Sequence, residues 1–266
     1  MNVSIVIYKH AWKEVESLIA SLQQSAVINN IYIIDNSPTP SEAFNQPDWI
    51  YFFAGKNLGY GAAHNIALRK TIQNNVPYHL VVNPDIDLKA SVLDKIIKFM
   101  DAHTDVGHLM PRVLYPNGEI QYLCKLLPAP SDLFIRRFLP ESWSKKRMQT
   151  FEMRNTEYSK IMDVPYLSGC FMLLRTEAIK KAGIFDERFF MYPEDIDLTR
   201  RIGQHFRTIF YPEVSVTHHH ARSSYINFRM LFIHSWNLIK YFNKWGWIFD
   251  KERKKINQQL IKHLSL

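Results

Sequence analysis

Cysteine is scarce in this chain, because Cys124 and Cys170 are its only two among 266 residues. Two cysteines cannot build a disulfide framework, and their separation excludes the CxxC pattern of a zinc site. Long apolar runs are absent too, since no window holds the roughly 18 residues that a spanning helix needs. The N-terminus lacks the basic leader and the apolar run of a signal peptide. We therefore expect a protein of a reducing compartment, the cytoplasm.

Positive charge is unevenly distributed along the chain. The net charge is +8, yet residues 221–266 hold nine Lys/Arg against two acids, which is +7. The body before them is nearly neutral, which is not the footprint of a nucleic-acid binder. A basic tail instead predicts a local anionic partner, such as lipid headgroups or phosphates.

Short apolar runs alternate with helical patterns through the first half. Residues 3–7, 31–34 and 49–53 suit strands, and each run stops at polar or glycine-containing turn residues. Apolar residues at helical spacing follow the first run. Strand, helix and strand with short links predict an α/β fold: a Rossmann-like, mainly parallel central sheet flanked by helices.

The clearest candidate site follows the apolar run near residue 80. The run stops at Asn83 and Pro84, and Asp85 and Asp87 come directly after the break. Open α/β sheets bind ligands beyond the carboxyl ends of such strands. Two carboxylates at this spacing can share a hard divalent cation, which can hold a diphosphate. The alternative is that Asp85 caps the next helix and Asp87 is merely solvated.

Further candidates follow the other strands of the first half. Tyr8 can stack on a base, although an aromatic residue at a strand end is often core. Asp35 can accept hydrogen bonds from a ribose or base. A loop from Asn57 to Asn65 enters a small-residue helix, where Gly59 lets backbone amides approach an anionic ligand. Close helix packing explains this glycine equally well.

Acids and histidines recur in the second half. Glu194 and Asp195 follow a proline and suit the first turn of a helix, which stabilises Asp195 as an anion able to accept a proton. The alternative for both acids is complementarity to the helix dipole alone. His218, His219 and His220 follow a probable strand, whose alternation sends His218 and His220 to one side. One of that pair can complete a metal site with Asp87; a solvated cluster is the alternative.

Two segments stand apart from this pattern. Residues 124–160 contain prolines and basic clusters, and we interpret them as an insertion that contacts an acceptor or as a surface excursion. The tail, residues 225–266, mixes aromatic residues with cations. It fits a helix lying on an anionic membrane. It fits equally well a helix packed on the domain or in a homodimer interface.

The motifs together resemble the inverting family 2 glycosyltransferases of GT-A fold, especially their rhamnosyltransferase-like branch. The resemblance spans residues 2–224 and depends on the order and spacing of the strand-end acids, the glycine loop, the acid pair and the histidines. It implies a GT-A domain over 1–224, followed by the basic helical tail, 225–266. Within the domain, 1–110 would bind the nucleotide and 111–224 would provide the acceptor and catalytic half.

The resemblance also implies roles for the candidate residues. Asp87 would ligate Mg²⁺ or Mn²⁺ directly, and Asp85 would hold the ribose or help at the metal. His218 would be the downstream metal ligand, with His220 as the alternate. Asp195 would be the general base, with Glu194 beside it. The nucleotide-sugar contacts would come from Tyr8, Asp35, Asn57, Gly59, Asn65, Asn83 and Asp85.

The expected donor is a dTDP- or UDP-sugar, with rhamnose the preferred sugar. The expected acceptor is a saccharide or lipid-linked saccharide, which suits a cytoplasmic protein at the inner face of the plasma membrane. Two other classes stay open. A nucleotidyltransferase would need a basic glycine-rich loop after the first strand, and residues 8–10 offer none. A catalytically silent, membrane-associated binding module would not need all these acids.

Overall fold

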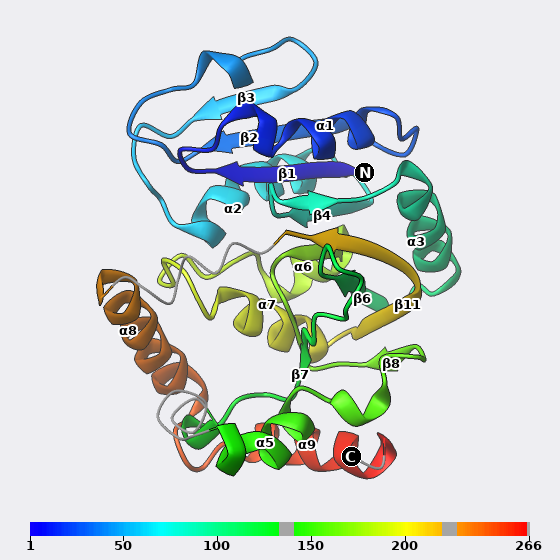
Figure 1. Ribbon diagram of the computed structural model, residues 1–266, viewed down its shortest axis with the longest axis vertical. Coiled ribbons are helices and arrows are strands. Elements are labelled where there is room, and N and C mark those ends of the chain that lie inside the picture. The colour runs from blue at the N-terminus through cyan, green and yellow to red at the C-terminus, as the bar shows by residue number, and fades with distance from the viewer. Residues whose placement is uncertain (133–140, 220–227, 265–266) are drawn as a thin grey trace.

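One curled sheet runs through the middle of the molecule, with helices on both of its faces (Figure 1). The computed structural model describes residues 1–132, 141–219 and 228–264. In spatial order the main strands are β3 (Ile50–Phe53), β2 (Asn30–Asp35), β1 (Asn2–Ile7), β4 (Tyr78–Val82), β10 (Phe171–Arg175), β6 (Val106–Leu114), β11 (Arg207–His218) and β5 (Ile86–Asp87). The short strand β8 (Met162–Asp163) pairs with β11, and β7 (Cys124–Lys125) pairs with β9 (Tyr166–Leu167) in a separate ribbon.

The sheet confirms the predicted α/β class and adds antiparallel strands. Strands β3, β2, β1 and β4 run parallel to one another, as do β6 and β11. The short strands β5 and β8 pair antiparallel with β11. Strand β10 lies antiparallel between β4 and β6. Because β10 runs backwards, its first residue lies beside the last residue of β4, with Phe171 opposite Val82. The start of β10 therefore reaches the same edge of the sheet as the carboxyl ends of the parallel strands.

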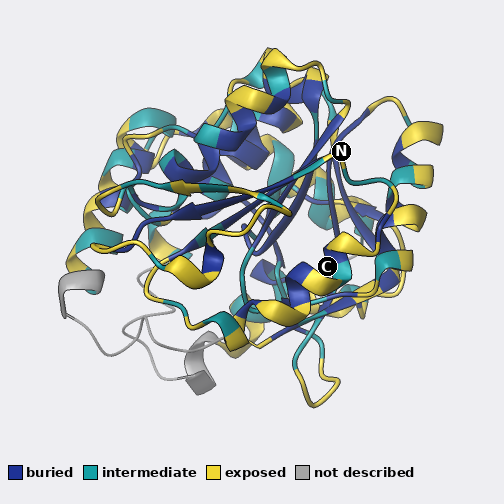
Figure 2. Ribbon diagram, turned by 90° about the horizontal axis from the view of Figure 1, so that it is seen from above, coloured by how far each residue is buried: buried dark blue, intermediate teal, exposed yellow. Residues whose placement is uncertain are grey.

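The helices that pack on this sheet bury one face each. Figure 2 shows buried strands through the centre and exposed outer faces on the surrounding helices. In α3, for example, the residues at helical spacing Val92, Leu93, Ile96 and Met100 are buried. The helices are α1 (Glu16–Gln23), α2 (Tyr60–Gln73), α3 (Ala90–Ala102), α5 (Glu141–Phe151), α6 (Thr176–Ala182), α7 (Glu194–Gly203), α8 (Phe228–Trp245) and α9 (Lys251–Leu264).

The core is continuous between the two predicted halves of the domain. One cluster of buried side chains joins strands of the first half, such as Ile5 and Leu80, to Leu109, Leu173 and Val216 farther along the chain. Strand β4 is buried at every residue, which is why its sequence reads as an unbroken apolar run. Truncating such a side chain to alanine typically costs about 2–5 kcal/mol.

Strand β11 has an irregularity around Pro212, because its pairing with β6 shifts between Tyr211 and Ser215. Proline lacks the N–H that a ladder position would use, so a shift there is expected. Beyond it the strand continues to His218 and brings that side chain to the edge where β4 ends.

The tail packs on the body through α8 and α9. Tyr241 and Phe242 of α8 are buried with Phe189 and Ile196. Arg200 of α7 binds Asp250 with two contacts of 2.7 and 2.8 Å and reaches Glu252 at 2.8 Å. These contacts favour the packed-helix interpretation for the inner face of the tail. Within the described ranges, no helix is both long and apolar enough to cross a membrane.

Candidate active site

The candidate site forms where β4, β10 and β11 meet the start of α7. The turn after β4 is held to the start of β10 by a hydrogen bond from Asn83 N–H to the Cys170 carbonyl, at 2.9 Å. The N–H of His219, just past β11, donates to the Asp85 carbonyl at 3.0 Å. Helix α7 enters from the other side, where Gly169 N–H donates to Asp195 Oδ2 at 3.0 Å. Side chains from four separate elements are thus fixed around one edge.

Asp85 and His218 face each other at this edge. Their Oδ1 and Nε2 atoms are 3.3 Å apart, and His218 is 5% exposed. Gln121 fixes the ring, since its Nε2 donates to the His218 carbonyl at 2.8 Å and its Oε1 lies 3.0 Å from Nδ1. An amide oxygen only accepts, so Nδ1 donates to Gln121 and Nε2 is the ring nitrogen that faces Asp85. Such an outer partner is typical of histidines that ligate metals.

Asp87 has a different partner from the one that the sequence predicted. Its Oδ2 lies 2.5 Å from His219 Nε2, and both side chains are substantially exposed. The reason is the antiparallel pairing of β5 with β11, which places Asp87 opposite Thr217 and Ile86 opposite His218. Asp85, rather than Asp87, therefore lies beside His218 in the described structure, and the role of Asp87 as a metal ligand stays a prediction. His220, the alternate ligand, falls outside the described residues.

The pair Asp85 and His218 fits a divalent cation. Around an octahedral ion with bonds of about 2.1 Å, adjacent ligand atoms lie about 3 Å apart, close to the spacing observed here. A carboxylate oxygen and an imidazole nitrogen also suit Mn²⁺. Among the described residues no group of three His, Cys, Asp or Glu is placed to hold a metal. Completion of the coordination shell would need oxygen atoms from a ligand or water.

Glu194 and Asp195 begin α7 in unequal surroundings. Glu194 is 4% exposed, and within the described structure its Oε2 has no hydrogen-bond partner. Burial, followed by the charge of Asp195, raises the pKa of Glu194 well above its ordinary value. Burial also raises the pKa of Asp195, but N–H groups of Gly169 and Ile196 and the charge of Lys125 oppose that rise. Burial thus favours the neutral acid at both positions, and at Asp195 two N–H groups and a cation act against it.

Two residues of this site escaped the sequence analysis. The Tyr60 hydroxyl lies 2.5 Å from the Gly169 carbonyl and 3.2 Å from Asn83 Oδ1, so it bridges the β4 turn to the start of β10. Lys125 of β7 is a buried cation whose Nζ lies 5.2 Å from the centre of the Tyr166 ring. It comes from the segment interpreted as an insertion. For Tyr60 the sequence signal was an aromatic residue between two glycines. Lys125 had no sequence signal.

The residues predicted to contact the nucleotide, Tyr8 and Asp35, differ in their solvent exposure. Tyr8 is 46% exposed at the end of β1, where its ring is free of the core. Asp35 is fully buried, and its carboxylate accepts from Ser37 N–H at 2.8 Å and from the Tyr51 hydroxyl at 2.7 Å. Burial, with the Asp35 hydrogen bond second, raises the pKa of Tyr51 to about 12. The Tyr8 ring is thus accessible to a nucleobase, whereas Asp35 holds Ser37 and Tyr51 in place after β2.

The glycine loop is organised by packing. A Cβ on Gly59 would come within 2.2 Å of the Phe190 carbonyl oxygen, and the φ of Gly59 is +87°. Asn57 Oδ1 accepts from the Gly59 N–H at 2.9 Å. Asn65 is fully buried and exchanges hydrogen bonds with the backbone of Phe185, at 2.9 and 3.0 Å. The expected ligand contact of Asn65 is corrected to a structural one, because its amide is already used and covered.

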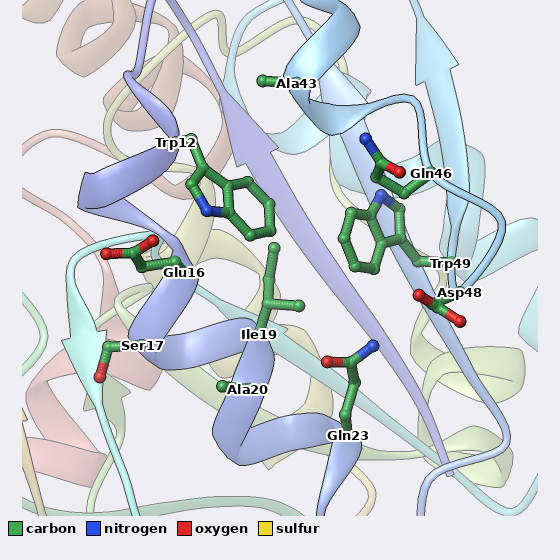
Figure 3. Close-up of a pocket in the computed structure, with 10 residues that line it drawn as sticks. All are labelled: Trp12, Glu16, Ser17, Ile19, Ala20, Gln23, Ala43, Gln46, Asp48 and Trp49. Atoms are coloured by element: carbon green, nitrogen blue, oxygen red, sulfur yellow. The ribbon is translucent and has the colours of Figure 1, made fainter.

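A separate surface pocket lies beside α1. It has a volume of about 870 Å³ and is lined by Trp12, by residues of α1 and by the segment before β3, which includes Trp49 (Figure 3). The two indole rings are 5.7 Å apart, inclined at 19°. Since none of the predicted site residues lines this pocket, it is not part of the candidate active site.

Sequence comparison relates the chain to named rhamnosyltransferases. No family model matches the chain. The chain is 27% identical over 208 residues to the N-acetylglucosaminyl-diphospho-decaprenol L-rhamnosyltransferase of Mycobacterium tuberculosis, over 73% of this chain and 68% of that protein. It is 24% identical over 234 residues to Rhamnosyltransferase WbbL of Escherichia coli, over 83% and 86%.

A solved structure shares the fold. GalNAc-T7, crystallised with UDP, GalNAc and Mn²⁺, superposes with a TM-score of 0.59 at 12% identity, over 82% of this chain. The match spans only 43% of the GalNAc-T7 chain. The fold and the sequence likenesses define a glycosyltransferase of GT-A fold. More closely, the likeness to two named rhamnosyltransferases supports the family 2, rhamnosyltransferase-like branch that the motifs predicted.

Proposed function

We propose that the protein is a metal-dependent, inverting glycosyltransferase. It would move a sugar, preferably rhamnose, from a dTDP- or UDP-sugar to a hydroxyl of a saccharide or lipid-linked saccharide in cell-surface polysaccharide assembly. One observation carries the proposal. The base Asp195 is fixed at the same sheet edge as Asp85 and His218, through the Gly169 N–H at 3.0 Å.

The residues at this edge divide the reaction between them. Asp195 takes the proton of the acceptor hydroxyl while the oxygen of that hydroxyl attacks the anomeric carbon. The bond from the anomeric carbon to the diphosphate breaks on the opposite face. Glu194, neutral beside it, stays out of the proton transfer. Asp85 and His218 would hold Mg²⁺ or Mn²⁺, which when bound neutralises the departing diphosphate. Because one displacement suffices, the centre inverts and no enzyme nucleophile is needed.

The acceptor and location follow from the relatives rather than from this chain. The Mycobacterium tuberculosis protein is named for an acceptor linked to diphospho-decaprenol, a lipid carrier. A lipid-linked acceptor would require the enzyme to work at a membrane surface, and we propose a cytoplasmic protein at the inner face of the plasma membrane. A homodimer is a further expectation from the sequence alone.

Binding of nucleotide sugars tests the proposal directly. Titration calorimetry with UDP- and dTDP-sugars is expected to show binding with Mn²⁺ and loss of that binding when EDTA removes the metal. Slow hydrolysis of the bound donor would identify the sugar. If no nucleotide sugar binds in the presence of Mn²⁺, the chain is better described as a silent binding module.

The two aspartates after β4 give a sharper prediction. Asp85→Asn is expected to weaken Mn²⁺-dependent donor binding by more than about tenfold. The reason is that Asp85 Oδ1 and His218 Nε2, 3.3 Å apart, would hold the metal together. Asp87→Asn is the matched control, since Asp87 contacts His219 at the surface, and should change binding by less than about threefold. Calorimetry on both variants decides the matter. The opposite order of effects would restore Asp87 as the metal ligand.

A further inference from the structure

Helix α8 turns its polar side chains inward. Asn237 is 1% exposed and donates to the Met191 carbonyl at 2.8 Å. Lys244 lies 2.7 Å from a carboxylate oxygen of Asp197 and 2.9 Å from Asp186. A surface helix normally directs such groups to water. The inner side of α8 therefore already has partners for its amide and its charge.

The outer side of α8 is apolar instead. Phe232 is 70% exposed, Trp236 52% and Ile239 37%. Their spacing of three and four places them on one face of the helix. Asn243 continues that face by one turn, and its Oδ1 accepts from Trp247 Nε1 at 2.8 Å. Large side chains thus form a line along the outside of the helix.

The line continues past the end of the helix. Ile248 is 78% exposed and Phe249 92%, in the link between α8 and α9. Soluble proteins rarely expose contiguous apolar surface of this kind without a partner for it. We call this set the α8 stripe: Phe232, Trp236, Ile239, Trp247, Ile248 and Phe249.

Cations border the tip of the stripe. Lys251, Lys254 and Lys255 are exposed in the first turns of α9, immediately after Phe249. Within the described part of the chain, no carboxylate forms an ion pair with any of these lysines. Arg253, in contrast, is buried and donates to the Trp247 carbonyl at 3.1 Å. Three charges are left for an external anion.

We propose that the α8 stripe and these lysines dock the protein on an anionic bilayer. Exposed aromatic and aliphatic side chains beside lysines suit the boundary between headgroups and acyl chains. A second copy of this chain is the alternative occupant, and the three lysines at the tip favour an anionic surface instead. The purpose of docking rests on the proposed lipid-linked acceptor, whereas the surface stands on its own contacts.

Docking through α8 would also orient the catalytic helix. Trp245 Nε1 donates to Asp197 Oδ1 at 2.8 Å, two residues after the base Asp195. Figure 1 shows α8 along one side of the molecule, next to α7, with α9 along the adjacent end. A membrane bound at the stripe would therefore be held in a fixed relation to the start of α7.

Sedimentation with vesicles tests the proposal without donor or acceptor. Full-length protein is expected to sediment with phosphatidylglycerol–phosphatidylcholine vesicles. Ile248→Ser with Phe249→Ser should lower the partition coefficient by at least about tenfold, because it removes two exposed apolar side chains. The matched control is Phe52→Ser, which alters a similarly apolar side chain, 43% exposed, on β3. It should bind as the wild type does.

The lysines have their own arm of the experiment. Substitution of Lys251, Lys254 and Lys255 by Gln should reduce binding by about tenfold or more at low salt, and the wild type should lose binding as salt rises. Equal binding to pure phosphatidylcholine would overturn the role of the lysines. Point substitutions are needed because deleting 225–266 would also remove Lys244 and Asp250, which pair with buried charges of α7.

Three results separate this proposal from its alternatives. No sedimentation of the wild type would overturn it, whatever the transferase assay gives. A concentration-dependent dimer in sedimentation velocity, lost in the Phe249→Ser variant and without vesicle binding, would assign the stripe to a second copy. Retained transfer to a water-soluble acceptor by the Ile248 and Phe249 variant, with lost vesicle binding, would support docking separate from catalysis.

Discussion

Asp195→Asn is expected to abolish sugar transfer while leaving donor binding nearly unchanged. The amide keeps the size of the carboxylate and can still accept from Gly169 N–H through its oxygen, at the present 3.0 Å. It cannot take a proton from the acceptor hydroxyl. General-base catalysis typically contributes about 10²–10⁴-fold, so the rate should fall by at least that factor. Transfer kinetics together with donor calorimetry would measure the two effects separately.

Glu194→Gln is the control for this prediction. Because the raised pKa of Glu194 keeps its proton in place, an amide should replace the neutral acid with little loss of rate. The rate of the wild type should fall as pH drops through the pKa of Asp195, which burial sets above the ordinary aspartate value. Lys125→Met should move that fall to higher pH, since the lysine charge lowers the pKa. Full activity in Asp195→Asn, or its loss only in Glu194→Gln, would reassign the base.

Arg200→Met is expected to destabilise the fold more than any substitution at the surface. The Arg200 and Asp250 side chains are 1% and 3% exposed, and the guanidinium also lies 4.0 Å from the centre of the Trp245 ring. Without Arg200, the Asp250 carboxylate would keep, among the described residues, only the Arg253 N–H at 2.9 Å and the guanidinium of Arg253 at 4.0 Å. Breaking a buried ion pair in this way costs about 3–5 kcal/mol. Denaturant unfolding should show this loss as a lower midpoint.

Arg207→Met provides the comparison. Arg207 pairs with Asp163 and Asp105, but all three side chains are between 44% and 58% exposed. Exposed pairs contribute about 0–1 kcal/mol, so this variant should remain close to the wild type. Similar losses in the two variants would mean that the contact of α7 with the tail is not structurally important.

The positions of the main site residues could be predicted from the local sequence pattern. Asp85, Asp195 and His218 each follow an apolar run or begin a helix, and an α/β sheet gathers such positions at one edge. The partners of these residues could not be predicted. Whether Asp85 or Asp87 faces His218 depends on the pairing of β5 with β11, across more than 130 residues. Gln121, 97 residues from His218, carries no local sign of its role.

Asn65 illustrates a second limit. Its place in a glycine loop suggested a ligand contact, yet its amide binds the backbone of Phe185, 120 residues away. A buried asparagine that satisfies distant backbone groups looks the same in sequence as one that binds a ligand. The tail was similarly ambiguous, because a helical wheel separates polar from apolar residues without saying which side is covered. The contacts of Asn237 and Lys244 with the body settle that question.

The ion pairs of Asp197 bear on when the enzyme becomes active during its synthesis. Asp197 is fully buried, and Lys244 and Trp245, which contact its carboxylate, are made almost 50 residues later. Until that segment leaves the ribosome, Arg201 is the one ion-pair partner among the described residues that is present for this carboxylate. A chain grows from its N-terminus, so the donor-side sheet can form first, whereas the catalytic helix is secured among the last elements. Nascent chains that stop before α8 should therefore carry an assembled sheet but an unfinished base.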